Sequence, residues 1–305
     1  MKILVIGASG LVGSRFTELY PTPGDLITPT SHELDLTHAP QLREYLARTQ
    51  PDAVINLAAY TDVAGAESQR GDKSGLCWQL NVVGPTNLAS AITPTTRLLQ
   101  ISTDMVFSGL PDNPGPYPES HPPEKDSSRL TWYGFTKAES ERALRRSLGN
   151  RATILRLIYP VRANFPAKLD YLRKPLKLFD EGKLYPMFTD QQISISFIDE
   201  AATALKKILF TDSTGIFHAS SPDTTTPFEL CSYLILKARG TENAVHGGDL
   251  DSFLKTASNP TRYPKFGGLK VEETEQRLGI KFSRWKQIVD KLLEQGIARA
   301  TTNRK

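Results

Sequence analysis

Tyr133 and Lys137 are the residues of this sequence best suited to acid–base chemistry. They stand four positions apart, which places a phenol and an ammonium on one face if the segment is helical. A nearby ammonium favours the phenolate and lowers the tyrosine pKa from about 10, so the phenol can exchange a proton nearer neutral pH. Such a pair suits carbonyl reduction. Since the same spacing also occurs as a plain contact on a helix surface, the pair needs support from other residues.

Three polar residues, Ser102, Thr103 and Asp104, follow the apolar run 98–101. If that run is a strand of a parallel sheet, these side chains lie at the carboxyl edge, where such sheets bind ligands. A hydroxyl there can polarise the carbonyl that Tyr133 would protonate. A strand-ending turn capped by Ser, Thr and Asp is the structural alternative.

Gly7, Gly10 and Gly13 come directly after a short apolar run and open a segment with a helical pattern. Glycine allows a tight turn and a close approach of the backbone to a pyrophosphate, and a helix start offers N–H groups to the phosphates. This context predicts a dinucleotide-binding turn, and a plain glycine turn between strand and helix is the alternative. The other backbone groups that we expect at the phosphates belong to Ser9, Leu11 and Val12.

The choice of dinucleotide depends on the end of the second apolar run, which is Thr30-Ser31-His32. A carboxylate at that tip would bind the ribose 2′-hydroxyl and repel a 2′-phosphate, so its absence slightly favours NADPH over NAD. Glu33 is the nearest carboxylate. Asp35 and Leu36 are expected at the adenine, although a helix N-cap or a turn explains Asp35 equally well.

Alternating strand and helix patterns position these motifs. A succession of this kind predicts a parallel sheet covered by helices on both faces, a Rossmann-type doubly wound α/β fold. The expected strands are 3–6, 26–27, 53–57, 98–101 and 152–159. The expected helices between them are 11–20, 40–49, 76–91 and 133–148.

The pattern loosens after about residue 160, where prolines are scattered among helical pieces. We therefore expect a dinucleotide-binding domain at 1–160 and a smaller, mixed substrate-binding lobe at 161–305, with 190–220 returning to the first domain. Gly279 is the expected stop of a helix within 272–295, and Trp285 begins an apolar face. The polar tail 301–305 is expected to fray.

Composition narrows the class of protein further. The chain has 305 residues, 39% of them hydrophobic, a net charge of +4 and only two cysteines, Cys77 and Cys231. Basic and acidic residues are interleaved, and no apolar run reaches the roughly 18 residues that span a bilayer. We expect a cytoplasmic enzyme without a metal site that binds neither nucleic acid nor membrane, and a homodimer is left open.

With these motifs in order, the chain resembles the extended short-chain dehydrogenases/reductases, and among them the dTDP-4-dehydrorhamnose reductases. The resemblance runs nearly end to end and is loosest after residue 160. Its motifs are Gly7-x-x-Gly10-x-x-Gly13, Asp35-Leu36, Asn56-Leu57-Ala58-Ala59-Tyr60-Thr61 with Ala66-Glu67, Asn81, Ser102 to Gly109, Tyr133-Gly134-x-x-Lys137 with Glu141, Asn164-Phe165, Asp190-Gln191 and Trp285.

The resemblance implies hydride transfer to a 4-keto carbon of a nucleotide-linked deoxysugar. Tyr133 would protonate the oxygen, Lys137 would also hold the nicotinamide ribose, and Thr103 would bind the reacting oxygen. The residues implied at the cofactor besides these and the glycine turn are Asp35, Leu36, Ala58, Ala59, Tyr60 and Ser102. The residues implied at the substrate are Thr103, Asp104, Met105, Tyr159 and Asn164.

Two departures from the family pattern leave the sugar open. Met105 stands where these reductases usually carry an aromatic residue, and Tyr159-Pro160 occupies a stretch where Trp-Val-Tyr-Gly is common. One alternative is a regulatory subunit that binds NADP(H) without turnover, as in methionine adenosyltransferase, but Tyr133, Lys137 and Thr103 are intact. Another is an epimerase or dehydratase. Dehydratases usually carry a glutamate after an acidic residue in the position of Asp104, and here Met105 follows.

Overall fold

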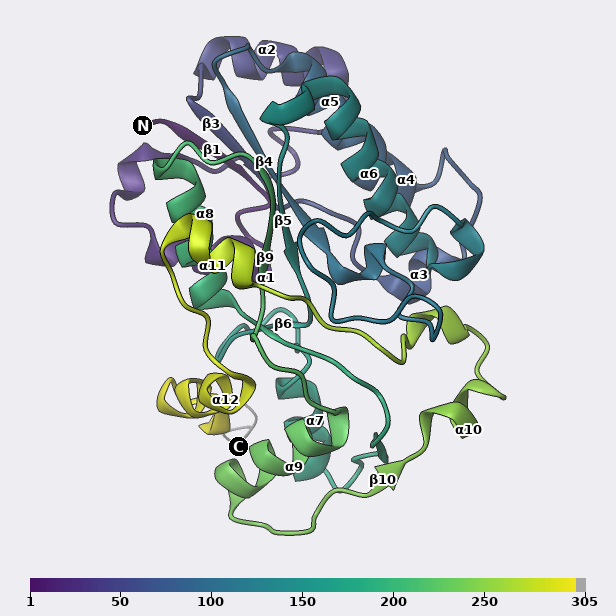
Figure 1. The fold of residues 1–305 in the computed structure, drawn as a ribbon. Helices are drawn as coiled ribbons and strands as arrows, with labels where there is room; N and C mark the ends of the chain where they lie inside the picture. The colour runs from purple at the N-terminus through teal and green to yellow at the C-terminus, as the bar shows by residue number, and fades with distance from the viewer. Residues whose placement is uncertain (300–305) are drawn as a thin grey trace. The chain divides into compact units, whose positions relative to one another are not determined.

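In the computed structural model, which describes residues 1–299, the apolar runs of the first half form one six-stranded sheet in the order β2-β1-β3-β4-β5-β9 (Figure 1). Pairing is parallel between β1 and its two neighbours and between β3 and β4, so the carboxyl ends of these strands share one edge. The strands are β1 Ile3–Ile6, β2 Leu26–Ile27, β3 Ala53–Asn56, β4 Arg97–Thr103, β5 Thr153–Leu157 and β9 Gly215–Ala219.

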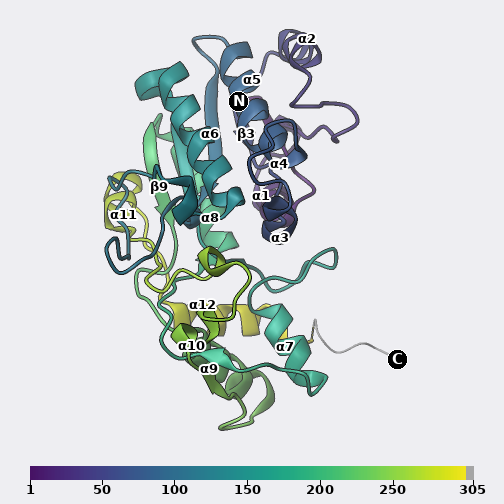
Figure 2. The same cartoon turned by 90° about the vertical axis from the view of Figure 1, so that its right-hand side faces the viewer.

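Helices cover both faces of this sheet, and the predicted Rossmann-type α/β fold is confirmed. α2, α5 and α6 lie on one face, and α8 lies on the opposite face (Figures 1 and 2). Leu42 of α2, Leu88 of α5 and Leu144 of α6 are fully buried in a shared core with sheet residues such as Val54. The helices are α1 Leu11–Leu19, α2 Ala39–Thr49, α3 Val63–Glu67, α4 Leu76–Trp78, α5 Gly84–Ala91, α6 Trp132–Leu148 and α8 Ile198–Phe210.

The expected helix 76–91 is interrupted. It consists of α4, a π-helical turn over Gln79–Val83, and α5. Pro85 lies in the first turn of α5 and has no N–H to donate to the carbonyl of residue 81, which explains the widened turn just before it. Asn81 therefore sits inside a π-helical turn, a feature that often marks functional sites.

The chain divides into two compact units. The first comprises Met1–Ser108, Ser120–Arg156 and Ala202–Phe217, and the second comprises Gly109–Glu119, Leu157–Ala201 and the residues from His218 onward. The second unit pairs β6 with β8 and β7 with β10, both in parallel. Its elements are β6 Pro160–Val161, α7 Arg173–Asp180, β7 Met187–Phe188, β8 Ser196–Phe197, α9 Pro227–Arg239, β10 Gly247–Gly248, α10 Leu250–Leu254, α11 Glu272–Leu278 and α12 Trp285–Glu294.

The second unit has an apolar core of its own, to which Leu176, Leu234 and Ile288 contribute from α7, α9 and α12. The predicted helix stop is confirmed, because Gly279 ends α11 in the left-handed conformation with φ of 60°. The tail 301–305, for which we expect fraying, lies outside the described residues. Among residues 1–299, none of the helices combines the length and the apolar character that crossing a bilayer requires.

Candidate functional site

The glycine turn joins β1 to α1 and packs against the chain that follows β3. Gly7 has a φ of +80°, and a Cβ there would lie 2.7 Å from the Ala58 nitrogen. A Cβ on Gly13 would lie 2.2 Å from the Gly7 carbonyl oxygen, so neither position accepts a side chain. A Cβ on Gly10 would meet that same oxygen at 3.3 Å and nothing else nearby in the described chain. The Gly10 side of the turn is therefore open to an approaching ligand.

The start of α1 fits an anion. Gly10 occupies the N-cap position without a side-chain cap, and the first turn holds no acidic residue. Amide groups and the helix dipole at such an end favour phosphate. Ser9 and Gly10 are exposed, and Leu11 and Val12 are partly buried. The residues present are therefore compatible with the pyrophosphate of a dinucleotide.

Asp35 and Leu36 have structural partners in this fold. The Asp35 carboxylate accepts hydrogen bonds from the Thr37 amide at 2.8 Å and from the Thr37 hydroxyl at 2.7 Å. This is the turn that we weighed as the alternative to adenine binding. The Leu36 side chain is buried in the core of the first unit. Contact of these two residues with a cofactor stays a prediction.

Two buried asparagines fix the segment Ala58–Tyr60 after β3. The Asn56 side chain accepts from the Ala58 amide at 3.2 Å and donates to Gln100 at 2.8 Å. Asn81 accepts from the Tyr60 amide at 2.8 Å and donates to the Tyr60 carbonyl at 3.2 Å. This segment, which includes Ala59, is thus held partly buried at the carboxyl edge of the sheet.

Thr103, Asp104 and Tyr133 come together at the end of β4. The Thr103 hydroxyl donates to the Asp104 carboxylate at 3.1 Å and accepts from the Met105 amide at 3.2 Å. Burial raises the pKa of Tyr133 well above its usual value of 10; the charge of Asp104 raises it further, and a hydrogen bond with Thr103 opposes the rise. Burial also raises the pKa of Asp104 to about 7. The phenol therefore holds its proton firmly.

Lys137 is buried one turn after Tyr133 in α6, and its ammonium donates to the Ile101 carbonyl at 2.7 Å. Burial lowers the pKa of Lys137 to about 8, and the Glu141 carboxylate opposes this shift. The expectation that Lys137 lowers the pKa of Tyr133 is not met, because desolvation of the phenol and the charge of Asp104 raise this pKa and the opposing influence is the hydrogen bond with Thr103. Tyr133 is therefore protonated at neutral pH, which is the state that a proton donor to a more basic oxyanion needs.

Ser102 and Met105 border the same group. The Ser102 hydroxyl is buried and has no hydrogen-bond partner among the described residues, which marks it as a group that a ligand could satisfy. A Cβ on Gly134 would lie 2.1 Å from the Met105 carbonyl oxygen. The start of α6 thus touches the turn Thr103–Met105 backbone to backbone.

The other two predicted substrate residues belong to the second unit. Tyr159 has a φ of 39° and stacks on Tyr171 with ring centroids 4.1 Å apart. A positive φ is uncommon for an aromatic residue and is typical of constrained, often functional positions. Asn164 is exposed. The grouping of these two residues with Thr103 stays a prediction.

Sequence reasoning identifies Glu67 and Glu141 only as motif residues, and their partners, through which they hold α6 in place, were missed. Arg156 in β5 forms a fully buried ion pair with Glu141, at 2.6 Å. Glu67, the last residue of the five-residue helix α3, accepts from the amide of Trp132. A helix this short leaves no periodicity to find, and the partners of both carboxylates are distant in sequence.

Comparisons with known proteins decide the family. The model of the RmlD substrate binding domain family matches residues 1–297. The chain belongs to this RmlD family. The dTDP-4-dehydrorhamnose reductase of Streptomyces griseus is 32% identical over 73% of this chain and 71% of its own length. A probable low-salt glycan biosynthesis reductase of Haloferax volcanii is 29% identical over 92% of this chain and 93% of its own.

Solved structures of other proteins share the fold. The dTDP-4-dehydrorhamnose reductase of Bacillus anthracis, crystallised with NADP, superposes with a TM-score of 0.80 at 23% identity, covering 97% of this chain and 100% of its own. The WbmH enzyme of Bordetella bronchiseptica, crystallised with NAD⁺, gives a TM-score of 0.72 at 20% identity, covering 98% of this chain and 99% of its own. The predicted family resemblance is confirmed.

Proposed function

We propose that this chain is an NADPH-dependent reductase of the 4-keto group on a nucleotide-linked deoxysugar. The observation that carries the proposal is the meeting of Thr103, Asp104 and the protonated phenol of Tyr133 at the end of β4, with Lys137 one turn further along α6. The relatives named as dTDP-4-dehydrorhamnose reductases support this substrate class for a member of the RmlD family.

The cofactor would lie on the glycine turn. Gly10 and the amides of Ser9, Leu11 and Val12 would hold the pyrophosphate. The segment Ala58–Tyr60 would line the nicotinamide half of the cofactor, where the Ser102 hydroxyl would form a hydrogen bond. NADPH, when bound, supplies the hydride. NADPH is favoured over NADH because Glu33, the nearest carboxylate, is engaged with Thr30 at 2.8 Å and 2.9 Å.

The proton comes from the chain. As hydride adds to the carbonyl carbon, the C=O π bond breaks, and its electron pair takes the proton of Tyr133, giving an alcohol. Thr103 would donate a hydrogen bond to the same oxygen and stabilise the charge that develops on it. Lys137, with a pKa of about 8, is charged at neutral pH and stabilises the phenolate left behind.

We further propose that the second unit supplies the sugar-nucleotide contacts, with Asn164 and Tyr159 as the residues to test. Because Met105 stands where these reductases usually carry an aromatic residue, the identity of the sugar stays open, and a panel of 4-keto sugars is needed to find it. The two cysteines, both free and buried, support a reducing cytoplasmic setting, and gel filtration decides between monomer and homodimer.

Cofactor titration followed by an oxidation assay tests the proposal. The protein is expected to bind NADPH, and to oxidise it when a dTDP-4-keto-6-deoxysugar is generated in situ. Binding without oxidation across a panel of nucleotide 4-keto sugars would instead favour a regulatory subunit. Conversion of the sugar without net NADPH consumption would favour an epimerase.

A further inference from the structure

The amino-terminal turn of α6 carries Tyr133 as its second residue, so whatever fixes this turn fixes the phenol. Thr131 occupies the N-cap position, and its hydroxyl accepts from the Gly134 amide at 3.0 Å. The first helical amide, that of Trp132, needs a partner from elsewhere because the first four N–H groups of a helix have none within it. Trp132 is buried, so water does not replace that partner.

Glu67 supplies this partner from α3. Its Oε1 atom accepts from the Trp132 amide at 2.5 Å, a contact made 65 residues away in sequence. A carboxylate is the favoured group at this end of a helix because of the helix dipole. Glu67 therefore acts as a second cap of α6, provided through the tertiary fold.

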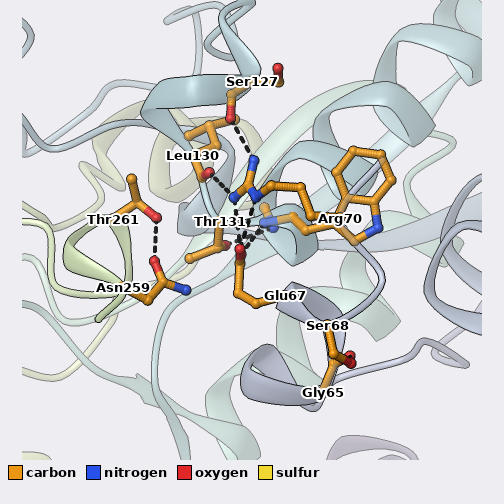
Figure 3. Close-up of polar contacts among 11 residues, drawn as sticks. Gly65, Glu67, Ser68, Arg70, Ser127, Leu130, Thr131, Asn259 and Thr261 are labelled. Atoms are coloured by element: carbon orange, nitrogen blue, oxygen red, sulfur yellow. Dashed lines mark hydrogen bonds and ion pairs between the residues drawn. The ribbon is translucent and has the colours of Figure 1, made fainter. Parts of the chain in front are cut away.

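Arg70 holds Glu67 in place and joins it to the chain that enters α6. Its guanidinium donates to both Glu67 carboxylate oxygens, at 2.9 Å and 3.1 Å. It also donates to the carbonyls of Ser127 at 3.1 Å and Leu130 at 2.8 Å, as Figure 3 shows. Charge-assisted bidentate hydrogen bonds of this kind fix the relative orientation of the two side chains and also stabilise the fold.

Aromatic packing connects the start of α6, which Glu67 and Arg70 hold, with the ring of Tyr133. Trp132 stacks on Trp78 and on Phe135, with ring centroids 5.6 Å apart in both pairs. The Tyr133 ring packs on the same cluster, which includes Ala66, the neighbour of Glu67. On its other side the turn touches the backbone of Met105. A shift of the α6 start therefore moves Tyr133 relative to Thr103.

We propose that Glu67 and Arg70 are positioning residues that hold the phenol of Tyr133 in reach of the reacting oxygen. The inference rests on the proposed function, since it assigns a purpose to the position of the proton donor. Neither residue donates a proton itself. A misplacement of about 1 Å can cost on the order of 100-fold in rate.

Kinetics of Glu67→Ala test this inference. We expect kcat to fall about 10- to 100-fold with both KM values changed by less than about threefold, and Glu67→Gln to recover most of the rate because its amide oxygen still accepts from Trp132. The matched control is Glu139→Ala. Glu139 forms a similar pair with Arg142 on α6, at 2.6 Å and 25% exposure against 21% for Glu67, away from the α6 start.

Amide hydrogen exchange of the peptide 131–135 provides a second measurement that needs no turnover. Faster exchange in Glu67→Ala than in Glu139→Ala is expected. Equal exchange in the two variants, or a kcat of Glu67→Ala equal to that of the control, would overturn the inference. If the wild type reduces no sugar but the exchange difference is present, the proposed function fails while the positioning of Tyr133 stands.

Discussion

Tyr133 is placed where losing its proton to water is costly but passing it to a nearby oxyanion is not. Burial and Asp104 raise the pKa of the phenol, so it is protonated at neutral pH, as a general acid must be. Tyr133→Phe is expected to lower kcat by about 10²- to 10⁴-fold. Because the glycine turn is untouched, NADPH affinity measured by fluorescence titration should stay the same. Retained turnover would remove Tyr133 from the proton path.

Asp104 contributes to the site at a cost in stability. Its pKa is raised to about 7 from 3.8, so between these values the folded chain binds more protons than the unfolded chain, and stability falls as pH rises. Asp104→Asn keeps the acceptor for Thr103 and removes the charge. We expect it to raise the free energy of unfolding by up to about 4 kcal/mol at pH 8 and not at pH 4. Equal urea midpoint differences at both pH values would contradict this.

At the scale of the elements, the glycine turn separates folding from binding. A Cβ on Gly13 meets a carbonyl oxygen at 2.2 Å, whereas one on Gly10 meets it at 3.3 Å. Gly13→Ala should therefore lower the free energy of unfolding by about 1–3 kcal/mol. Gly10→Val should cost less stability than Gly13→Ala and weaken NADPH binding about tenfold or more by blocking the approach of the pyrophosphate. Unchanged binding would disprove the assignment of this turn.

The strand β5 and the helix α6 are joined by the buried pair of Arg156 and Glu141, with side chains 0% and 1% exposed. Removing one partner leaves a buried charge, so Glu141→Gln should cost about 3–5 kcal/mol in urea unfolding. Replacing both by methionine should recover most of this loss. The exposed pair of Glu18 and Arg15 is the control, and Glu18→Ala should cost less than about 1 kcal/mol. A double variant as unstable as the single one would argue against an ion-pair effect.

How far the sequence predicts an element depends on how local its cause is. β1, α1 and the glycine turn follow from residues within a few positions of one another, and the predicted succession of strand, turn and helix is confirmed; cofactor binding by the turn stays a prediction. The interruption of the helix 76–91 before Pro85 also has a local cause, but the apolar pattern of this segment predicts one continuous helix. The capping of α6 by Glu67 depends on a contact across 65 positions, and no local pattern encodes it.

The same distinction applies to the candidate site. Tyr133, Lys137 and Thr103 are found from residue type and spacing, and the structure brings Thr103 and Tyr133 together at the end of β4. The direction of the Tyr133 pKa could not be found this way, because it depends on desolvation by the folded chain. For Asp35, by contrast, the sequence does suggest the turn with Thr37, as the alternative to adenine binding, and the structure contains this turn.

At the scale of the whole molecule, an RmlD-family chain of two units combines a Rossmann-type unit that fits a dinucleotide with a second unit for which we propose the sugar nucleotide. The proposed reduction predicts that one NADPH is consumed for each sugar reduced. It also predicts that the hydride ends on the sugar and the proton comes from Tyr133.

The fate of the hydride is the most direct test of this account. The enzyme would be supplied with NADPH carrying deuterium at the transferable position and with a dTDP-4-keto-6-deoxysugar, and the product examined by mass spectrometry and NMR. We expect one deuterium on the sugar carbon that bore the keto group, with one NADPH consumed per product. A sugar product without deuterium, or unchanged NADPH in the presence of bound cofactor and several nucleotide 4-keto sugars, would contradict the central claim.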